Sequence, residues 1–270
     1  MSSLPTVPRI VQLGEGGRIW ALGALRGDDV AAAALAQPLL ARWQRGDRLV
    51  VLGNMLGDRG DPAGTLDLLL RLRRRLLAIS LACDVHFLRG AQEEIWQKAL
   101  RLQFAISPLG VLDWMLAHGL AGIIGAYGGS VDEGRIACRG GPTAIARWTT
   151  GLRDLQAARP GHADLLTTLS RAAVTGSDRM LLSAAGVDAN RPLGEQADAF
   201  WWNGQADGAL EASLTANATA GWDSLARLVR GSGAAAGESA DDRRVLTVSR
   251  ERPALVALGP DGALLERIEA

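Results

Sequence analysis

The sequence predicts an α/β fold built around a parallel sheet, because three successive stretches each read as strand, turn and helix. The clearest strand is residues 49–52, Leu-Val-Val-Leu, a short apolar run that suits a strand buried on both faces. Residues 53–60 then form a glycine-rich polar turn, and residues 65–77 have the periodicity of a helix. Right-handed crossovers would place the three turns along one edge of the sheet, where α/β proteins carry their sites.

Turn residues and hydrophobic periodicity set the remaining expected elements. The flanking units have strands at 18–23 and 84–88, turns at 24–27 and 89–92, and helices at 28–45 and 93–103. Beyond them we expect helices at 143–158 and 162–173, and strands at 180–187, 225–230, 245–248, 254–258 and 263–268. Residues 1–17 are expected to be a loosely held lead-in.

Composition is typical of a globular protein, with 48% hydrophobic and 21% charged residues in a chain of 270. Lys+Arg and Asp+Glu both number 29, so net charge does not favour a nucleic-acid partner. No stretch reaches the ~18 apolar residues of a membrane span, and we expect no signal peptide. We therefore expect a cytoplasmic protein with Cys83 and Cys138 as reduced thiols. Heavy use of Ala, Gly, Leu and Arg, with a single lysine, indicates a bacterial, GC-rich genome.

Five glycine-containing segments follow one another in the order of the motifs of calcineurin-like metallophosphoesterases. The chain resembles the serine/threonine phosphatase and diadenosine-tetraphosphatase branch of that family, whose motifs read GDxHG, GDxxDRG, GNHE, HAG and GH. The counterparts here are residues 23–27, 53–60, 88–93, 184–187 and 229–232. The resemblance implies one domain over 1–270, a four-layer α/β/β/α sandwich. It also implies a helical cap insertion at about 104–175 and an antiparallel second sheet made by the last three strands.

The departures from these motifs decide the function that we expect. In the family, Asp, Asn and His side chains at these positions hold two metal ions, and the position of Gln92 carries the catalytic His. The matching residues here are Ala24, Arg26, Asn54, Ala91, Gln92, Ala184 and Ser232. Alanine cannot ligate a metal, and arginine is a cation that stays protonated. The resemblance therefore implies a pseudophosphatase with no catalytic residues, no metal and no cofactor, which docks a protein partner through its cap or its cleft.

Arginines near the motifs leave an anion-binding role open. Arg59 matches the phosphate-contacting arginine of the family, Arg26 replaces a metal ligand, and Arg89 lies nearby in the sequence. Guanidinium groups suit phosphate because they donate two parallel hydrogen bonds. Such a pocket would hold a phosphate or nucleotide anion without hydrolysing it. The other interpretation is that Arg26 pairs with the retained Asp58 or Glu93 and closes the site.

A working enzyme is the alternative function. It would be a metal-dependent phosphoesterase with a rebuilt site of oxygen ligands, for which Mn or Mg would be the cofactor. The residues available for such a site are Asn54, Asp58, Gln92 and Glu93. The histidines lie outside the five segments, so we expect structural roles for them: His86, His118 and His162.

Overall fold

Two five-stranded sheets form the centre of the molecule. The computed structural model describes residues 10–14, 16–80, 82–176, 179–217, 221–233 and 241–270. The first sheet has the order β10-β9-β2-β3-β4 and the second has the order β1-β5-β6-β7-β8. The strands of the first sheet are β2 (Ile19–Leu22), β3 (Arg48–Val51), β4 (Asp84–Phe87), β9 (Ala254–Leu258) and β10 (Leu264–Glu269). Those of the second are β1 (Ile10–Leu13), β5 (Ala172–Thr175), β6 (Met180–Ser183), β7 (Arg227–Arg230) and β8 (Val245–Thr247).

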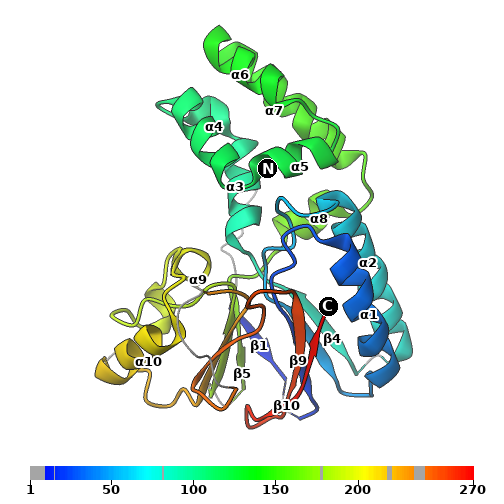
Figure 1. Cartoon of the computed structure of the whole chain (residues 1–270), viewed down its shortest axis with the longest axis vertical. Coiled ribbons are helices and arrows are strands. Elements are labelled where there is room, and N and C mark those ends of the chain that lie inside the picture. Colours follow the sequence, from blue (N-terminus) through cyan, green and yellow to red (C-terminus); the bar gives the residue numbers. More distant parts are fainter. Residues whose placement is uncertain (1–9, 15, 81, 177–178, 218–220, 234–240) are drawn as a thin grey trace, which may run out of the picture.

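The sheets pack face to face, and helices cover both outer faces (Figure 1). Buried apolar residues from both sheets, Val50 and Leu182 among them, form one cluster between the two layers. Helices α1 (Asp29–Arg42) and α2 (Pro62–Ile79) cover the first sheet. Helices α9 (Ala199–Trp202) and α10 (Asp207–Ala216) cover the second. The expected four-layer α/β/β/α sandwich is therefore confirmed.

The three strand-turn-helix units form as the local sequence predicts. Strands β2, β3 and β4 pair in parallel, with Trp20 opposite Leu49 and Leu49 opposite Val85. Asp28 caps α1, because its Oδ1 accepts a hydrogen bond from the backbone N–H of Ala31 at 2.8 Å. Helix α2 begins at Pro62, where the missing N–H costs no helical hydrogen bond. The turns after the three strands consequently lie at one edge of the first sheet.

Helices between the two halves of the fold rise above this edge (Figure 1). They are α3 (Ala91–Ala99), the 3-10 turn η1 (Leu102–Phe104), α4 (Pro108–Ala117), α5 (Leu120–Ala126), α6 (Val131–Gly140), α7 (Pro142–Ala157) and α8 (His162–Thr167). The helices α4 to α7, residues 108–157, are called the cap below. A second 3-10 turn, η2 (Leu193–Glu195), precedes α9. Among the described residues no single helix is long and apolar enough to cross a bilayer. One pair, α4 and α5, passes that test when taken together, but the two are bent by 90° where they meet.

Sheet membership differs from the expectation in one respect. The last three strands do not form an antiparallel second sheet, because β9 pairs antiparallel with β2 and β10 pairs with β9 in the first sheet. Only β8 joins the second sheet, where it runs parallel to β7. All five residues of β9 are buried, so this strand needs a neighbour on each side and a covered surface on each face.

Two segment predictions were also wrong. The helix expected over 162–173 ends at Thr167, and residues Ala172–Thr175 form the fully buried strand β5. Small residues such as Ala172 and Ala173 suit either structure, and tertiary packing decides between them. Residues Ile10–Leu13, expected in a loose lead-in, form β1, which pairs in parallel with β5. The earlier residues of that lead-in, 1–9, lie outside the described residues.

Candidate functional site

The five motif segments meet at the carboxyl ends of the strands, and backbone hydrogen bonds join them. The N–H groups of Leu25 and Arg26 donate to the carbonyl of Asn54 at 3.1 and 2.7 Å, which joins the first and second segments. The N–H of Ala24 donates to the carbonyl of Gly231 at 3.3 Å. The N–H of Ser232 donates to the carbonyl of Ala184 at 3.0 Å, which joins the fifth and fourth segments. Segments far apart in the sequence therefore build one site.

The turns approach each other so closely that glycine is required. A Cβ atom added to Gly90 would lie 2.2 Å from the backbone nitrogen of Asn54 and 2.7 Å from a carboxylate oxygen of Glu93. One added to Gly53, which has φ 76°, would lie 2.6 Å from the nitrogen of Gly90. Two other residues of the site, Arg26 (φ 56°) and Asn54 (φ 51°), adopt left-handed backbone conformations without being glycine. Such a conformation costs about 1–2 kcal/mol per residue, so the surrounding hydrogen bonds must hold these turns in place.

Glu93 binds the second and third segments together. Its side chain is fully buried, and burial raises the pKa of its carboxyl group, while the backbone N–H groups around it act in the opposite direction. One oxygen, Oε2, accepts from the N–H groups of Asn54 and Gly90, both at 2.8 Å. The other, Oε1, accepts from the N–H of Leu56 at 2.9 Å. Both carboxylate oxygens are thus occupied by the protein backbone.

The amides of Asn54 and Gln92 are also engaged. Asn54 Oδ1 accepts from the backbone N–H of Gln92 at 3.1 Å, and Asn54 Nδ2 donates to Ser232 Oγ at 3.4 Å. Gln92 Nε2 donates to the carbonyl of His118 at 2.9 Å, which ties the site to the end of α4. Gln92 Oε1 is buried and has no hydrogen-bond partner among the described residues. This oxygen is therefore an unsatisfied polar atom of the site.

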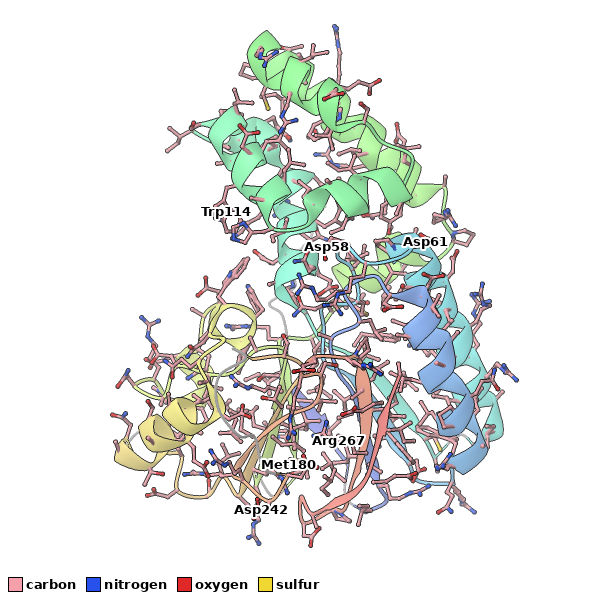
Figure 2. All side chains as sticks on the ribbon, in the orientation of Figure 1. Asp58, Asp61, Trp114, Met180, Asp242 and Arg267 are labelled. Atoms are coloured by element: carbon pink, nitrogen blue, oxygen red, sulfur yellow. The ribbon has the colours of Figure 1, made fainter. Side chains whose placement is uncertain are left out.

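The cap packs directly on the turn after β3. A Cβ added to Gly122 of α5 would lie 2.9 Å from the carbonyl oxygen of Gly57, and one added to Gly119 would lie 3.5 Å from Cβ of Asp58. Figure 2 shows Asp58 where this turn faces the cap helices. The start of α5 thus lies against the second motif segment.

The three candidate anion-binding arginines have different surroundings. Arg26 Nη2 lies 3.5 Å from Oδ1 of Asp58, and both side chains are about half exposed (46% and 49%). Arg59 donates its backbone N–H to the carbonyl of Arg26, and its residue is exposed with no side-chain partner among the described residues. Arg89 pairs with Glu94 at 2.9 Å and lies over the ring of Trp201 at 5.9 Å. Arg26 and Arg59 share one pair of turns, whereas Arg89 is held by other groups.

The remaining candidate positions carry no ligating atoms. Ala24 and Ala184 are buried methyl groups, and Ala91 is half-buried at the start of α3. Within the described ranges, no three His, Cys, Asp or Glu side chains are grouped so that they could hold a metal ion. The three histidines lie elsewhere: His86 on β4, His118 against Trp114, and His162 between Tyr127 and Asp67.

Sequence reasoning gave no specific role to a buried arginine that supports the fourth and fifth segments. Arg230 is fully buried and donates from Nη2 to Asp207 Oδ1 at 2.5 Å. It also donates to Thr247 Oγ1 at 2.8 Å and to the carbonyl of Ala185 at 3.0 Å. Burial lowers the pKa of Arg230, and Asp207 opposes that shift. The sequence signal of this buried pair was a charged residue, Arg230, at the end of the strand expected over 225–230.

A second missed feature is an aromatic and basic cluster between the cap and α9. Trp114 stacks on His118 at 4.3 Å between ring centroids and meets Trp202 edge-on at 6.0 Å. Lys98 lies over the Trp202 ring at 6.0 Å. Figure 2 shows Trp114 on the side of the cap that faces α9. These side chains come from three separate segments, so sequence spacing could not group them.

Comparison with known proteins places this fold. No protein-family model and no curated protein matches the chain. Among solved structures, a proposed diadenosine tetraphosphatase matches over 98% of this chain and 99% of its own, with TM-score 0.51 and 15% identity. A cold-active protein-tyrosine phosphatase of a psychrophilic Shewanella matches over 97% and 83% (TM-score 0.54, 12% identity). A serine/threonine phosphatase from Saccharomyces cerevisiae matches over 97% and 84% (TM-score 0.53, 12% identity).

These neighbours are phosphatases of the calcineurin-like metallophosphoesterase superfamily. The chain therefore has the metallophosphoesterase fold over nearly its whole length. At 12–15% identity the likeness establishes the fold, and the activity has to be argued from the site.

Proposed function

We propose that this chain is a catalytically inactive metallophosphoesterase-like protein, a pseudophosphatase that acts as a binding or regulatory module. The observation that supports this best is the state of Glu93, whose two carboxylate oxygens accept three backbone N–H bonds inside the turns. Those oxygens are engaged in holding the turns of the scaffold together. The motif glycines and the Glu93 carboxylate stabilise the turns. Their structural role explains why the turns keep their form although the side chains at the metal-ligand positions differ from those of the family.

The donor set does not suit a pair of metal ions. Ala24 and Ala184 offer methyl groups, and the oxygen of Asn54 accepts from Gln92, which leaves Asp58 as the one exposed carboxylate of the second motif segment. A two-metal phosphoesterase uses its ions to generate a hydroxide and to neutralise phosphoryl charge. Two cations of that charge need several carboxylates and imidazoles, so these side chains support binding without hydrolysis.

Metal analysis and turnover together test this proposal. The purified full chain is incubated with Mn, Mg, Zn or Fe, desalted and analysed for bound metal. It is then assayed with p-nitrophenyl phosphate, phosphopeptides and dinucleoside polyphosphates. We expect no stoichiometric metal and no turnover above a blank without protein, in the wild-type chain and equally in Asp132→Ala, a change on the exposed surface of α6. Bound metal at one or two equivalents, or turnover lost in Asp58→Ala or Gln92→Ala but not in Asp132→Ala, would refute the proposal.

One observation favours the alternative, a metal-dependent phosphoesterase with a rebuilt site. Gln92 Oε1 is buried without a partner among the described residues, and a buried unsatisfied oxygen calls for an explanation such as an ion or a water. An amide oxygen is a hard ligand suited to Mg or Mn. In this alternative, Gln92→Leu abolishes metal binding. In the pseudophosphatase, the same substitution leaves the metal content unchanged at zero.

Anion binding is a separable part of the proposal. It rests on Arg26 and Arg59, whose turns are joined by a 2.9 Å backbone hydrogen bond. The Arg26–Asp58 pair is exposed and long, so it contributes little and an anion can compete with Asp58 for the guanidinium. Isothermal titration with inorganic phosphate and with a nucleotide should show binding that Arg26→Ala and Arg59→Ala each weaken. The matched control is Arg139→Ala on α6, and equal weakening there would contradict a specific site.

A protein partner for the cap or the cleft is proposed on the same basis. The candidate surface is the aromatic cluster of Trp114, His118 and Trp202, because Trp114 is 45% exposed and Trp202 is 36% exposed. Exposed tryptophans of this kind are enriched at the centres of protein interfaces. Affinity capture with the wild-type chain and with a Trp114→Ala, Trp202→Ala double variant tests it. A set of captured proteins that is identical for the two baits would exclude this surface.

A further inference from the structure

One face of α7, its outer face, is exposed in the part of the chain that the structure describes. One face of the helix is buried by Ile145, Thr149, Leu152 and Gln156. The opposite face borders a shallow groove along the helix, lined by Thr143, Ala146, Arg147, Thr150, Gly151 and Asp154. Figure 1 shows α6 and α7 side by side at the end of the molecule farthest from the sheets. This face is therefore distant from the candidate site and accessible to a partner.

Opposite charges lie on this face without partners. Arg147 and Asp154 are seven residues apart, which is two helical turns, so both side chains project from the same side of α7. Neither forms an ion pair or a side-chain hydrogen bond within the described ranges. Their neighbours differ in this respect: Arg153 donates to Thr150 and to the carbonyl of Leu100, and Arg159 pairs with Asp67. The fold thus leaves one cation and one anion of α7 uncompensated.

A glycine lies between the two charges. Gly151 is exposed in the interior of α7, and a Cβ added to it would meet no atom within 4 Å. Glycine in a helix interior costs about 1 kcal/mol relative to alanine, and no contact among the described residues compensates for that cost. A missing side chain at this position does let a second helix approach closely, as small residues do at helix pairs.

We propose that the outer face of α7 binds a second copy of this chain. In an antiparallel pair of α7 helices, the two-fold axis passes between Thr150 and Gly151. Arg147 and Asp154 are equally far from that midpoint, so Arg147 of each copy meets Asp154 of the other, and both ion pairs form at once. A two-fold interface requires a self-complementary patch of this kind. Helix α7 has 16 residues, about 24 Å of length, so the contact lies at the small end of stable interfaces and the dimer is weak.

Charge reversal tests the arrangement, with analytical ultracentrifugation of the full chain over a wide concentration range. We expect a reversible monomer–dimer equilibrium for the wild-type chain. Each single change, Arg147→Asp or Asp154→Arg, turns both ion pairs into like-charge contacts and should raise the dissociation constant about tenfold or more. The double variant with both changes should restore it, because the exchanged charges meet again in the symmetric pair. The control Arg139→Asp, an exposed arginine on α6, should change little.

A steric variant gives an independent readout. Gly151→Leu should abolish the dimer while circular dichroism shows an unchanged folded monomer, because the added side chain projects into open space. A wild-type chain that stays monomeric at every concentration would overturn the proposal. So would a dimer that survives Gly151→Leu, or one that Arg147→Asp weakens no more than Arg139→Asp does. Failure of the double variant to recover would show that these two residues do not face each other.

Discussion

Replacing Glu93 by alanine tests the conclusion that this carboxylate holds the site together. The side chain is fully buried and accepts three hydrogen bonds, from the N–H groups of Asn54, Leu56 and Gly90. Each buried N–H left without an acceptor costs about 1–3 kcal/mol, and water entering the new space recovers part of that cost. We therefore expect the free energy of unfolding to fall by about 3–5 kcal/mol, a large share of the ~5–15 kcal/mol typical of a whole domain.

Urea denaturation followed by circular dichroism measures this loss, and Glu94→Ala is the matched control on the same helix. Glu94 pairs with Arg89 at 2.9 Å and with Lys98 at 3.4 Å, but it accepts no backbone hydrogen bond from the turns. Removing Glu94 leaves the three N–H groups of the turns satisfied, so it should cost less than removing Glu93. If Glu93→Ala and Glu94→Ala lower the unfolding free energy equally, then Glu93 is not the tie between the turns.

Three further predictions concern stability. Burial raises the pKa of Glu93, so the native state keeps a proton that the unfolded chain loses above about pH 4.5. The free energy of unfolding of the wild-type chain should therefore fall as the pH rises from 4.5 through the native pKa of Glu93. Urea midpoints measured over a pH series should show this decrease for the wild-type chain and lack it for Glu93→Gln. Gly90→Ala should unfold the site, because its Cβ would lie 2.2 Å from a backbone nitrogen. Gly151→Ala should instead stabilise the chain by about 0.5–1 kcal/mol, because its Cβ meets no atom. Equal melting temperatures for the two variants would contradict this prediction. Arg230→Met leaves Asp207 buried without its guanidinium and should cost about 3–5 kcal/mol, which Arg139→Met at an exposed position of α6 should not. Equal unfolding free energies for these two variants would show that the buried pair is dispensable.

The parts of the fold that depend on local sequence were predictable. Strands β2, β3 and β4 and the helices after them lie within a few residues of the predicted boundaries, because apolar runs, glycine turns and a proline at Pro62 each act over a few residues. The sheet to which β9 belongs could not be predicted in this way. Its pairing with β2 joins residues more than 200 positions apart, and the strand pattern is the same in either sheet.

The features of the site also separate into those that the sequence could predict and those that depend on tertiary contacts. The convergence of the five segments and the pairing of Arg26 with Asp58 were open to prediction, because motif order fixes the first and complementary charge suggests the second. The left-handed backbone of Arg26 and Asn54 was not, because neither residue type requires it. The bond from Gln92 to the carbonyl of His118 was also hidden, since it depends on how the cap folds back over the turns.

That bond gives the chain a natural optical reporter. The carbonyl that receives the Gln92 amide belongs to the residue whose ring stacks on Trp114, an indole that is 45% exposed. A ligand in the site that rotates the Gln92 side chain must break its hydrogen bond to the carbonyl of His118, at the end of α4. The ring of His118 stacks on the indole of Trp114, so the surroundings of that indole change as well. The tryptophan emission spectrum, read as the difference between the wild-type chain and Trp114→Phe, therefore registers events in the turns without any label attached to them.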